Sequence, residues 1–116
     1  VGLYADGEIG IPHHSDTVPS NEDLVLSISY GAPRLFVWRE YPEKIKDVPW
    51  TSKINLRTPQ HDVYQDYYFI LEDGDAVIFT GGSQLYSTHA VPEDHGKLGR
   101  RVNLTFRTGM EKLKHE

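Results

Sequence analysis

The triplet His14-Ser15-Asp16 is the first pattern in this sequence whose residue types and spacing could perform chemistry. In an extended segment, residues i and i+2 point to the same side, so the His14 and Asp16 side chains could reach one metal ion. A third ligand from a distant part of the chain would complete a face of two histidines and one carboxylate. Such a face suits Fe(II) and leaves positions open for a cosubstrate and oxygen. Taken alone, however, the triplet is more typical of a polar loop, because chance matches to H-x-D are common.

The second pattern that could perform chemistry is Arg101-x-Asn103-x-x-x-Arg107. In a strand these three side chains share one face. If that face is buried, the arginines need an anionic partner, and a guanidinium matches a carboxylate through two parallel hydrogen bonds. A dicarboxylate would then be a natural ligand. A solvated edge strand whose arginines pair with surface acids explains the pattern equally well.

Composition limits which kinds of site are possible. The 116 residues fit one domain. The absence of cysteine excludes disulfides, zinc-thiolate sites and thiol catalysis, so any metal must be bound by His, Asp or Glu. A net charge of -5 argues against a broad phosphate-binding surface and leaves only a local basic patch around Lys97, Arg100 and Arg101.

The sequence gives no sign of membrane insertion or secretion. No stretch approaches the roughly 18 consecutive apolar residues that span a bilayer, and no signal-peptide pattern opens the chain. Together with the lack of cysteine, this favours an intracellular location. The first residue is Val1 rather than Met, as in a processed chain or an excised fragment.

Short strands separated by turn signals account for most of the chain. Strands are expected over residues 24–30, 34–39, 53–57, 66–71, 75–80, 84–91 and 101–107. Strands 24–30 and 34–39 would form one hairpin, and strands 66–71 and 75–80 another, because only the short turns 31–33 and 72–74 separate them. Residues 41–50 and 92–99 are expected to be loops, and the charged tail from Glu111 to fray. Many short strands with regular turns indicate an all-β sandwich or jelly roll.

Taken together, these patterns resemble the AlkB-like Fe(II)/2-oxoglutarate-dependent dioxygenase family over nearly the whole chain. LYADGEIGIPHHSD resembles the strand that leads into H-x-D, and LVLSISYGAPRLFVW the strand pair after it. GDAVIFTGGSQLYSTHAVP is similar to the segment with the distal iron histidine, and RRVNLTFR to the R-x-N-x-x-x-R signature. The resemblance implies a double-stranded β-helix, a jelly roll of two facing antiparallel sheets. Residues 1–116 would form its single catalytic core.

The resemblance implies three iron ligands: His14, Asp16 and His89. His13 competes with His14, but the i, i+2 geometry favours His14, since His13 would point to the opposite side. The remaining histidines suit the third position less well because they lie in polar loops or the tail. They are His61, His95 and His115.

The same resemblance implies residues for 2-oxoglutarate. Arg101 would bind its distal carboxylate with help from the Tyr4 hydroxyl. Arg107 would meet the carboxylate near iron, with Asn103 close by. Arg100 precedes the motif and is expected to face solvent.

The activity that the resemblance implies is oxidative demethylation of N-alkylated nucleic-acid bases. It would use Fe(II), 2-oxoglutarate and O2, and release succinate, CO2 and formaldehyde. Such enzymes act on single strands or on bases flipped out of the stack. Aromatic side chains that could stack on a base, or simply pack in the core, are Trp38, Tyr41, Trp50, Tyr64 and Tyr86.

Three departures from the family pattern concern the substrate. Val18 stands where many repair members carry an acidic residue, and Gly2 where an asparagine is often found. The N-terminal segment that forms the nucleotide-recognition lid of repair members is not in this chain. Two alternatives therefore stay open: the same chemistry on a protein side chain or small metabolite, and a non-catalytic, cupin-like metal-binding module.

Overall fold

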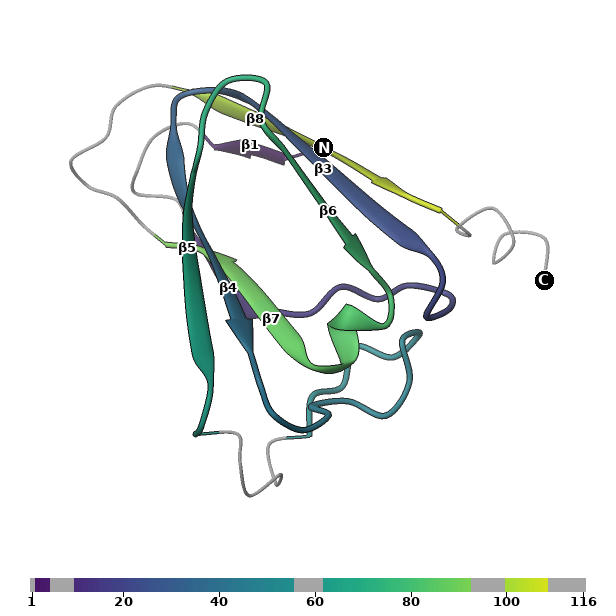
Figure 1. Cartoon of the computed structure of the whole chain (residues 1–116). Helices are drawn as coiled ribbons and strands as arrows, with labels where there is room; N and C mark the ends of the chain where they lie inside the picture. The colour runs from purple at the N-terminus through teal and green to yellow at the C-terminus, as the bar shows by residue number, and fades with distance from the viewer. Residues whose placement is uncertain (1, 5–9, 56–61, 93–99, 109–116) are drawn as a thin grey trace.

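Two four-stranded antiparallel sheets face each other in the computed structural model, which describes residues 2–4, 10–55, 62–92 and 100–108 (Figure 1). The first sheet has the order β1 (Gly2–Tyr4), β8 (Arg101–Arg107), β3 (Leu24–Gly31), β6 (Ala76–Thr80). The second has the order β2 (Ile11–His14), β7 (Ser87–Val91), β4 (Arg34–Glu40), β5 (Gln65–Leu71). A short 3-10 helix, η1, covers Ser83–Leu85.

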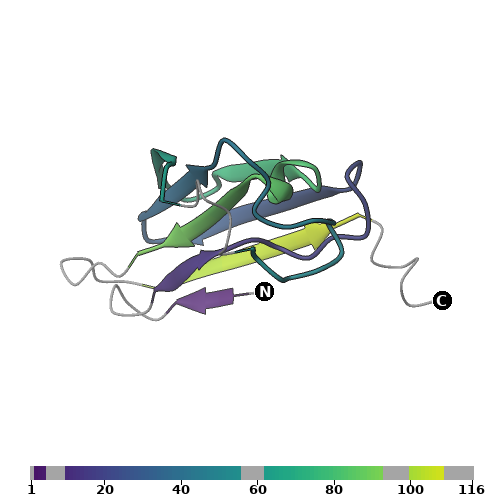
Figure 2. The same cartoon turned by 90° about the horizontal axis from the view of Figure 1, so that it is seen from below.

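The strand pairs are nested, as in a hairpin that has been rolled up. β1 pairs with β8, β2 with β7, β3 with β6 and β4 with β5, all antiparallel. Figure 2, a view from below, shows the two sheets as two layers. This is the double-stranded β-helix that was predicted. No helix among the described residues is long and apolar enough to cross a membrane.

The two predicted hairpins are wrong. β3 and β4 lie in different sheets, and so do β5 and β6. The turns between them are corners at which the chain passes from one sheet to the other, and Gly31 and Gly74 take positive φ angles of 99° and 86° there. A short glycine-containing turn fits a hairpin or a corner, so the local sequence could not distinguish them.

Two other element predictions need correction. Residues 53–55 form no strand, and 56–57 lie outside the described residues. The strand predicted over 84–91 begins only at Ser87, because Ser83–Leu85 form the 3-10 helix. Residues 41–50 are a loop, as expected, whereas 93–99 and the tail lie outside the described residues.

Strand β3 turns Val25 and two serines, rather than its larger apolar residues, toward the space between the sheets. Ser29 is 2% exposed and Ser27 lines the interior cavity, whereas Leu24 is 43% exposed. Ser27 and Ser29 bond to Asn103 and Arg101 on the neighbouring strand β8. The apolar core is correspondingly divided into two clusters, Phe36-Leu71-Val91 and Val18-Val25-Phe79, which Trp38 and Val77 join.

Candidate metal centre and cosubstrate pocket

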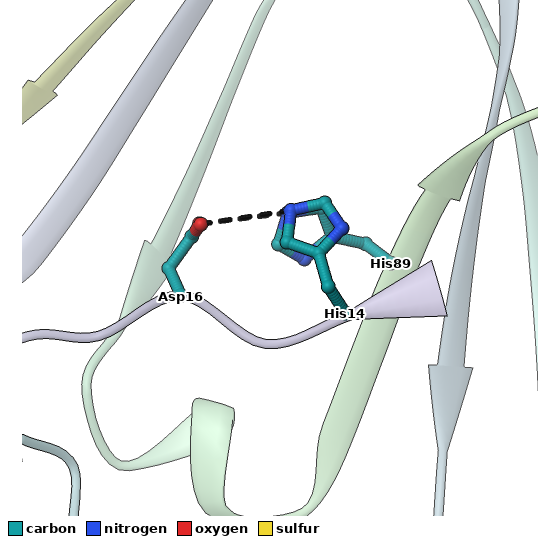
Figure 3. Close-up of side chains that lie close together, drawn as sticks. All are labelled: His14, Asp16 and His89. Carbon is teal, nitrogen blue, oxygen red and sulfur yellow. Dashed lines mark ion pairs between the residues drawn. The ribbon is translucent and has the colours of Figure 1, made fainter. Parts of the chain in front are cut away.

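Three potential metal ligands meet at one end of the space between the sheets. His14 ends β2, Asp16 follows in the next loop, and His89 pairs with His14 across the β2–β7 ladder. Their ligand atoms all lie within 4.8 Å of one another. The Asp16 carboxylate is 3.7 Å from His14 Nε2 and 3.5 Å from His89 Nε2 (Figure 3). The group could therefore hold one ion on a single face.

Neighbouring groups orient both imidazoles. His14 Nδ1 lies 2.9 Å from the Pro12 carbonyl oxygen, and a donated Nδ1–H leaves the Nε2 lone pair facing Asp16. The His89 ring packs against aromatic rings, with centroids 5.5 Å from Phe36 and 5.1 Å from Phe79. Both rings are thus held in position by neighbouring protein groups.

Burial keeps His89 neutral. The ring is only 7% exposed, and its desolvation lowers the pKa of His89 from 6.5 to about 4, although the nearby Asp16 carboxylate raises it. A neutral imidazole has a lone pair that is free for a metal, without competition from a proton near pH 7.

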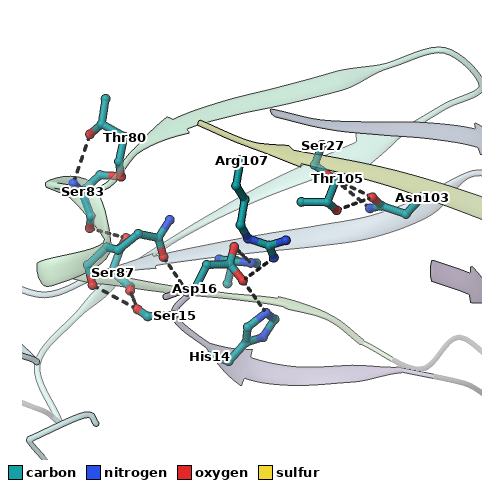
Figure 4. A network of polar contacts seen from close by, with 12 residues as sticks. His14, Ser15, Asp16, Ser27, Thr80, Ser83, Ser87, Asn103, Thr105 and Arg107 are labelled. Carbon is teal, nitrogen blue, oxygen red and sulfur yellow. Dashed lines mark hydrogen bonds and ion pairs between the residues drawn. The ribbon is translucent and has the colours of Figure 1, made fainter. Parts of the chain in front are cut away.

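A cavity of about 280 Å³ opens beside these three residues. Its polar wall comes from the inner face of β8, where Asn103, Thr105 and Arg107 line it together with Ser27 of β3. The Arg107 guanidinium lies 3.4 Å from Asp16 Oδ1 (Figure 4). Its apolar wall includes Phe36 and Phe79. A small anion could therefore bind in the cavity between the Arg107 guanidinium and the three potential metal ligands.

Of the other predicted cosubstrate residues, Arg101 lies farther along β8 and Tyr4 lies on the neighbouring strand β1. Arg101 is 1% exposed and donates a hydrogen bond to the Ser29 hydroxyl, but it is not among the described residues that line the cavity. Tyr4 pairs with Arg101 across the β1–β8 ladder, and its side chain lies outside what the structure describes. Arg100 is exposed, as expected.

The competing histidines are separated from the centre or lie outside the described residues. His13 points away from the cavity, and its Nδ1 lies 3.2 Å from the Thr88 hydroxyl. His61, His95 and His115 fall in the segments that the structure does not describe.

The proposed stacking aromatics have different environments. Trp38 stacks on His89 with a centroid distance of 5.8 Å, and Tyr41 and Tyr64 pack on each other at 5.8 Å. Trp50 and Tyr86 are exposed.

Sequence reasoning missed two residues that contact the Asp16 main chain. Gln84 accepts a hydrogen bond from the Asp16 N–H, and Lys46 donates one to the Asp16 carbonyl. Gln84 was assigned to a strand and Lys46 to a charged loop. Neither belongs to a motif whose spacing could have indicated the contact.

Comparison with known proteins supplies a family. A model of the 2OG-Fe(II) oxygenase superfamily matches residues 1–107. The chain is similar to alpha-ketoglutarate-dependent dioxygenase alkB homolog 3 of Rattus norvegicus, with 32% identity over 91% of this chain and 33% of the relative. It is also similar to the Homo sapiens protein of the same name, with 31% identity over 91% of this chain and 34% of the relative. The chain thus spans about a third of the length of these relatives.

Proposed function

The chain belongs to the 2OG-Fe(II) oxygenase superfamily, and we propose that it is the catalytic core of an AlkB-like dioxygenase with iron held by His14, Asp16 and His89. The observation that carries this proposal is the convergence of these side chains within 4.8 Å at the edge of a cavity. Two imidazoles and one carboxylate on one face are the donor set that suits Fe(II) and leaves coordination positions free. The donors therefore fit the metal that the family uses.

The cavity also fits the cosubstrate. We assign Arg107 and Asn103 to the end of 2-oxoglutarate nearest the metal, because both line the cavity and Arg107 already lies beside Asp16. We assign Arg101 and Tyr4, farther along β8 and β1, to the distal carboxylate. A buried guanidinium such as that of Arg101 is suited to a carboxylate partner.

The protein and the bound groups divide the chemistry between them. Fe(II), with 2-oxoglutarate and O2, supplies the oxidation of the substrate. The chain holds the ligands in fixed orientations through the Pro12 carbonyl and the rings around His89. Arg107 offsets the negative charge of a bound carboxylate, and the apolar wall formed by Phe36 and Phe79 limits the access of water.

For the substrate we propose N-alkylated bases of single-stranded or flipped-out nucleic acid, which would be demethylated with release of formaldehyde. Support comes from the resemblance to AlkB-like enzymes and from a second hollow that shares Phe36 and Phe79 with the cavity. Trp38, Tyr67 and Phe69 line this hollow and offer flat surfaces against which a base could stack.

The test begins with anaerobic addition of Fe(II) and 2-oxoglutarate. An absorption band at about 500 nm, typical of keto-acid chelation at such a face, should form in the parent protein and be absent from His14→Ala and Asp16→Ala. His13→Ala is the matched control, because His13 adjoins His14 but points away from the cavity. A folded parent protein that gives no band would favour the non-catalytic binding module.

Substrate is tested separately by formaldehyde release from methylated and unmethylated oligonucleotides. Release from the methylated strands alone supports base demethylation. A band without such release would redirect the search to protein side chains or small metabolites.

A further inference from the structure

The main chain of Asp16 is held from both sides by buried side chains. Its N–H donates to Gln84 Oε1 at 2.9 Å, and its carbonyl oxygen accepts from Lys46 Nζ at 2.7 Å. Gln84 is 0% exposed and Lys46 is 1% exposed. The peptide groups on both sides of the Asp16 Cα are therefore fixed, and with them the direction in which its side chain leaves the backbone.

These two contacts come from separate parts of the chain that meet around the loop after β2. Gln84 belongs to η1, and Lys46 to the long connection between β4 and β5. The connection is attached to η1 by a hydrogen bond of 2.7 Å from Ile45 N to Leu85 O. It is attached to the Asp16 loop by one of 2.9 Å from Val18 N to Pro49 O. The loop is thus enclosed between two anchored segments.

The residue before Asp16 is fixed as well. The Ser15 hydroxyl shares its one hydrogen between the carbonyl oxygens of Gln84 and Ser87 (Figure 4 shows Ser15 beside Ser87). Hydrogen bonds to consecutive groups of one short loop leave it little freedom to rotate. A metal site needs such rigidity, because its ligands must be held within fractions of an ångström.

The choice of a lysine at position 46 is informative. Burial of an ammonium group is costly, and an apolar side chain of similar length would fill the same space at lower cost. Among the described residues, the Lys46 ammonium donates its hydrogen bond to the Asp16 carbonyl oxygen. A role in packing alone would not require a polar end to this side chain, whereas holding the Asp16 carbonyl requires a hydrogen-bond donor that can reach it.

We propose that Gln84 and Lys46 are positioning residues, which fix the Asp16 backbone so that its carboxylate points toward His14 and His89. This inference rests on the proposed metal centre. Partners of metal ligands typically change metal affinity by about 10–100-fold when they are removed. The same range is expected here for loss of either hydrogen bond.

The test measures Fe(II) affinity by anaerobic titration, and folding by thermal melting of the metal-free protein. Lys46→Met and Gln84→Met keep the approximate length of each side chain and remove its hydrogen bond. Gln84→Glu restores an acceptor oxygen for the Asp16 N–H. The controls are Lys53→Met in the same connection and Gln65→Met on β5, since both residues are exposed.

Both methionine variants should bind Fe(II) about 10–100-fold more weakly, while Gln84→Glu, which keeps the acceptor oxygen, and the two controls keep parental Fe(II) affinity. Gln84→Glu should melt at a lower temperature, because position 84 is fully buried and a carboxyl group is costly to bury. Lys46→Met should melt at or above the parent temperature, because it no longer buries a charge. A purely structural role would lower the melting temperature and leave Fe(II) affinity intact in the folded protein. Folded methionine variants with parental affinity would overturn this inference alone. A parent protein that does not bind Fe(II) would overturn the proposed centre and this inference together.

Discussion

Gly31 and Gly74 lie at two of the places where the chain passes between the sheets, and substitution of each by alanine should have very different effects. Both have positive φ angles, 99° and 86°, which residues other than glycine rarely adopt. A Cβ atom at Gly74 would meet nothing within 4 Å, whereas one at Gly31 would overlap the Arg100 carbonyl oxygen and lie 3.2 Å from the Arg101 Cα. Gly74→Ala therefore isolates the backbone cost, and Gly31→Ala adds a collision with β8.

The size of each effect follows from these two contributions. A positive φ angle destabilises alanine relative to glycine by about 1–2 kcal/mol. Alanine also lowers the conformational entropy of the unfolded chain, which offsets about 0.4–1 kcal/mol of this loss. Gly74→Ala should therefore destabilise by about 1 kcal/mol. The collision at Gly31 is with backbone rather than a flexible side chain, and overpacking of this kind adds about 1–3 kcal/mol. We expect a total near 3 kcal/mol for Gly31→Ala.

The collision should also affect the cosubstrate. Gly31 pairs with Arg101, and the next residue, Ala32, donates a 2.9 Å hydrogen bond to the Arg100 carbonyl. A displaced corner would thus move the start of β8, which carries Arg101. Denaturant unfolding measures the stability loss, and titration with 2-oxoglutarate in the presence of Fe(II) measures the binding loss. Equal losses for Gly31→Ala and Gly74→Ala on both measures would refute the reasoning.

Three further predictions use the same assays. Arg107→Met should weaken 2-oxoglutarate binding by about 10–100-fold, the value of charge-assisted hydrogen bonds, and parental affinity would remove Arg107 from the cosubstrate site. Two hydrogen bonds from Arg39, at 2.8 and 3.0 Å, lower the pKa of Asp66. This pair stabilises the fold above the usual carboxyl pKa of about 4 and the contribution is lost as the pH falls through the lowered value. Asp66→Asn should therefore cost about 1 kcal/mol at pH 7 and little at acid pH, as pH-dependent unfolding would show. Fe(II) at a hundred times its dissociation constant should stabilise the parent by about 2.7 kcal/mol, and a melting curve of Asp16→Ala that shifts equally would mean that the ion binds elsewhere.

The sequence was sufficient where a few residues define the geometry. The i, i+2 relation places His14 and Asp16 together and directs His13 away, and the same alternation puts Asn103 and Arg107 on one face of β8. On β8 the strand backbone alone determines which side chains share a side, whereas Asp16 lies in the loop directly after β2 and continues the same alternation. Their binding roles remain predictions.

The sequence was insufficient where contacts join distant segments. The turn at Gly31 fits a hairpin, but the chain uses it as a corner, since β3 finds its partners in β6 and β8. The contact between Lys46 and Asp16 spans 30 residues and depends on how the long connection folds back. No local propensity encodes either arrangement.

The unusual alternation in β3 shows how the proposed site shapes the fold around it. A strand normally turns its apolar residues inward, yet here Ser27 and Ser29 face the interior. They do so because β8 brings Asn103 and Arg101 to the same space, and buried polar groups need hydrogen-bond partners.

This polar lining divides the interior into two environments. Arg107 and Ser27 line the cavity beside the Asp16 carboxylate, where an anion can be bound. On the other side His89 lies against the rings of Phe36 and Phe79, which keep it neutral and fixed. Interiors of this size usually form one apolar core, and the division costs stability. A site that binds a metal and a dicarboxylate next to each other requires both environments, which gives a physical reason for the small, divided core.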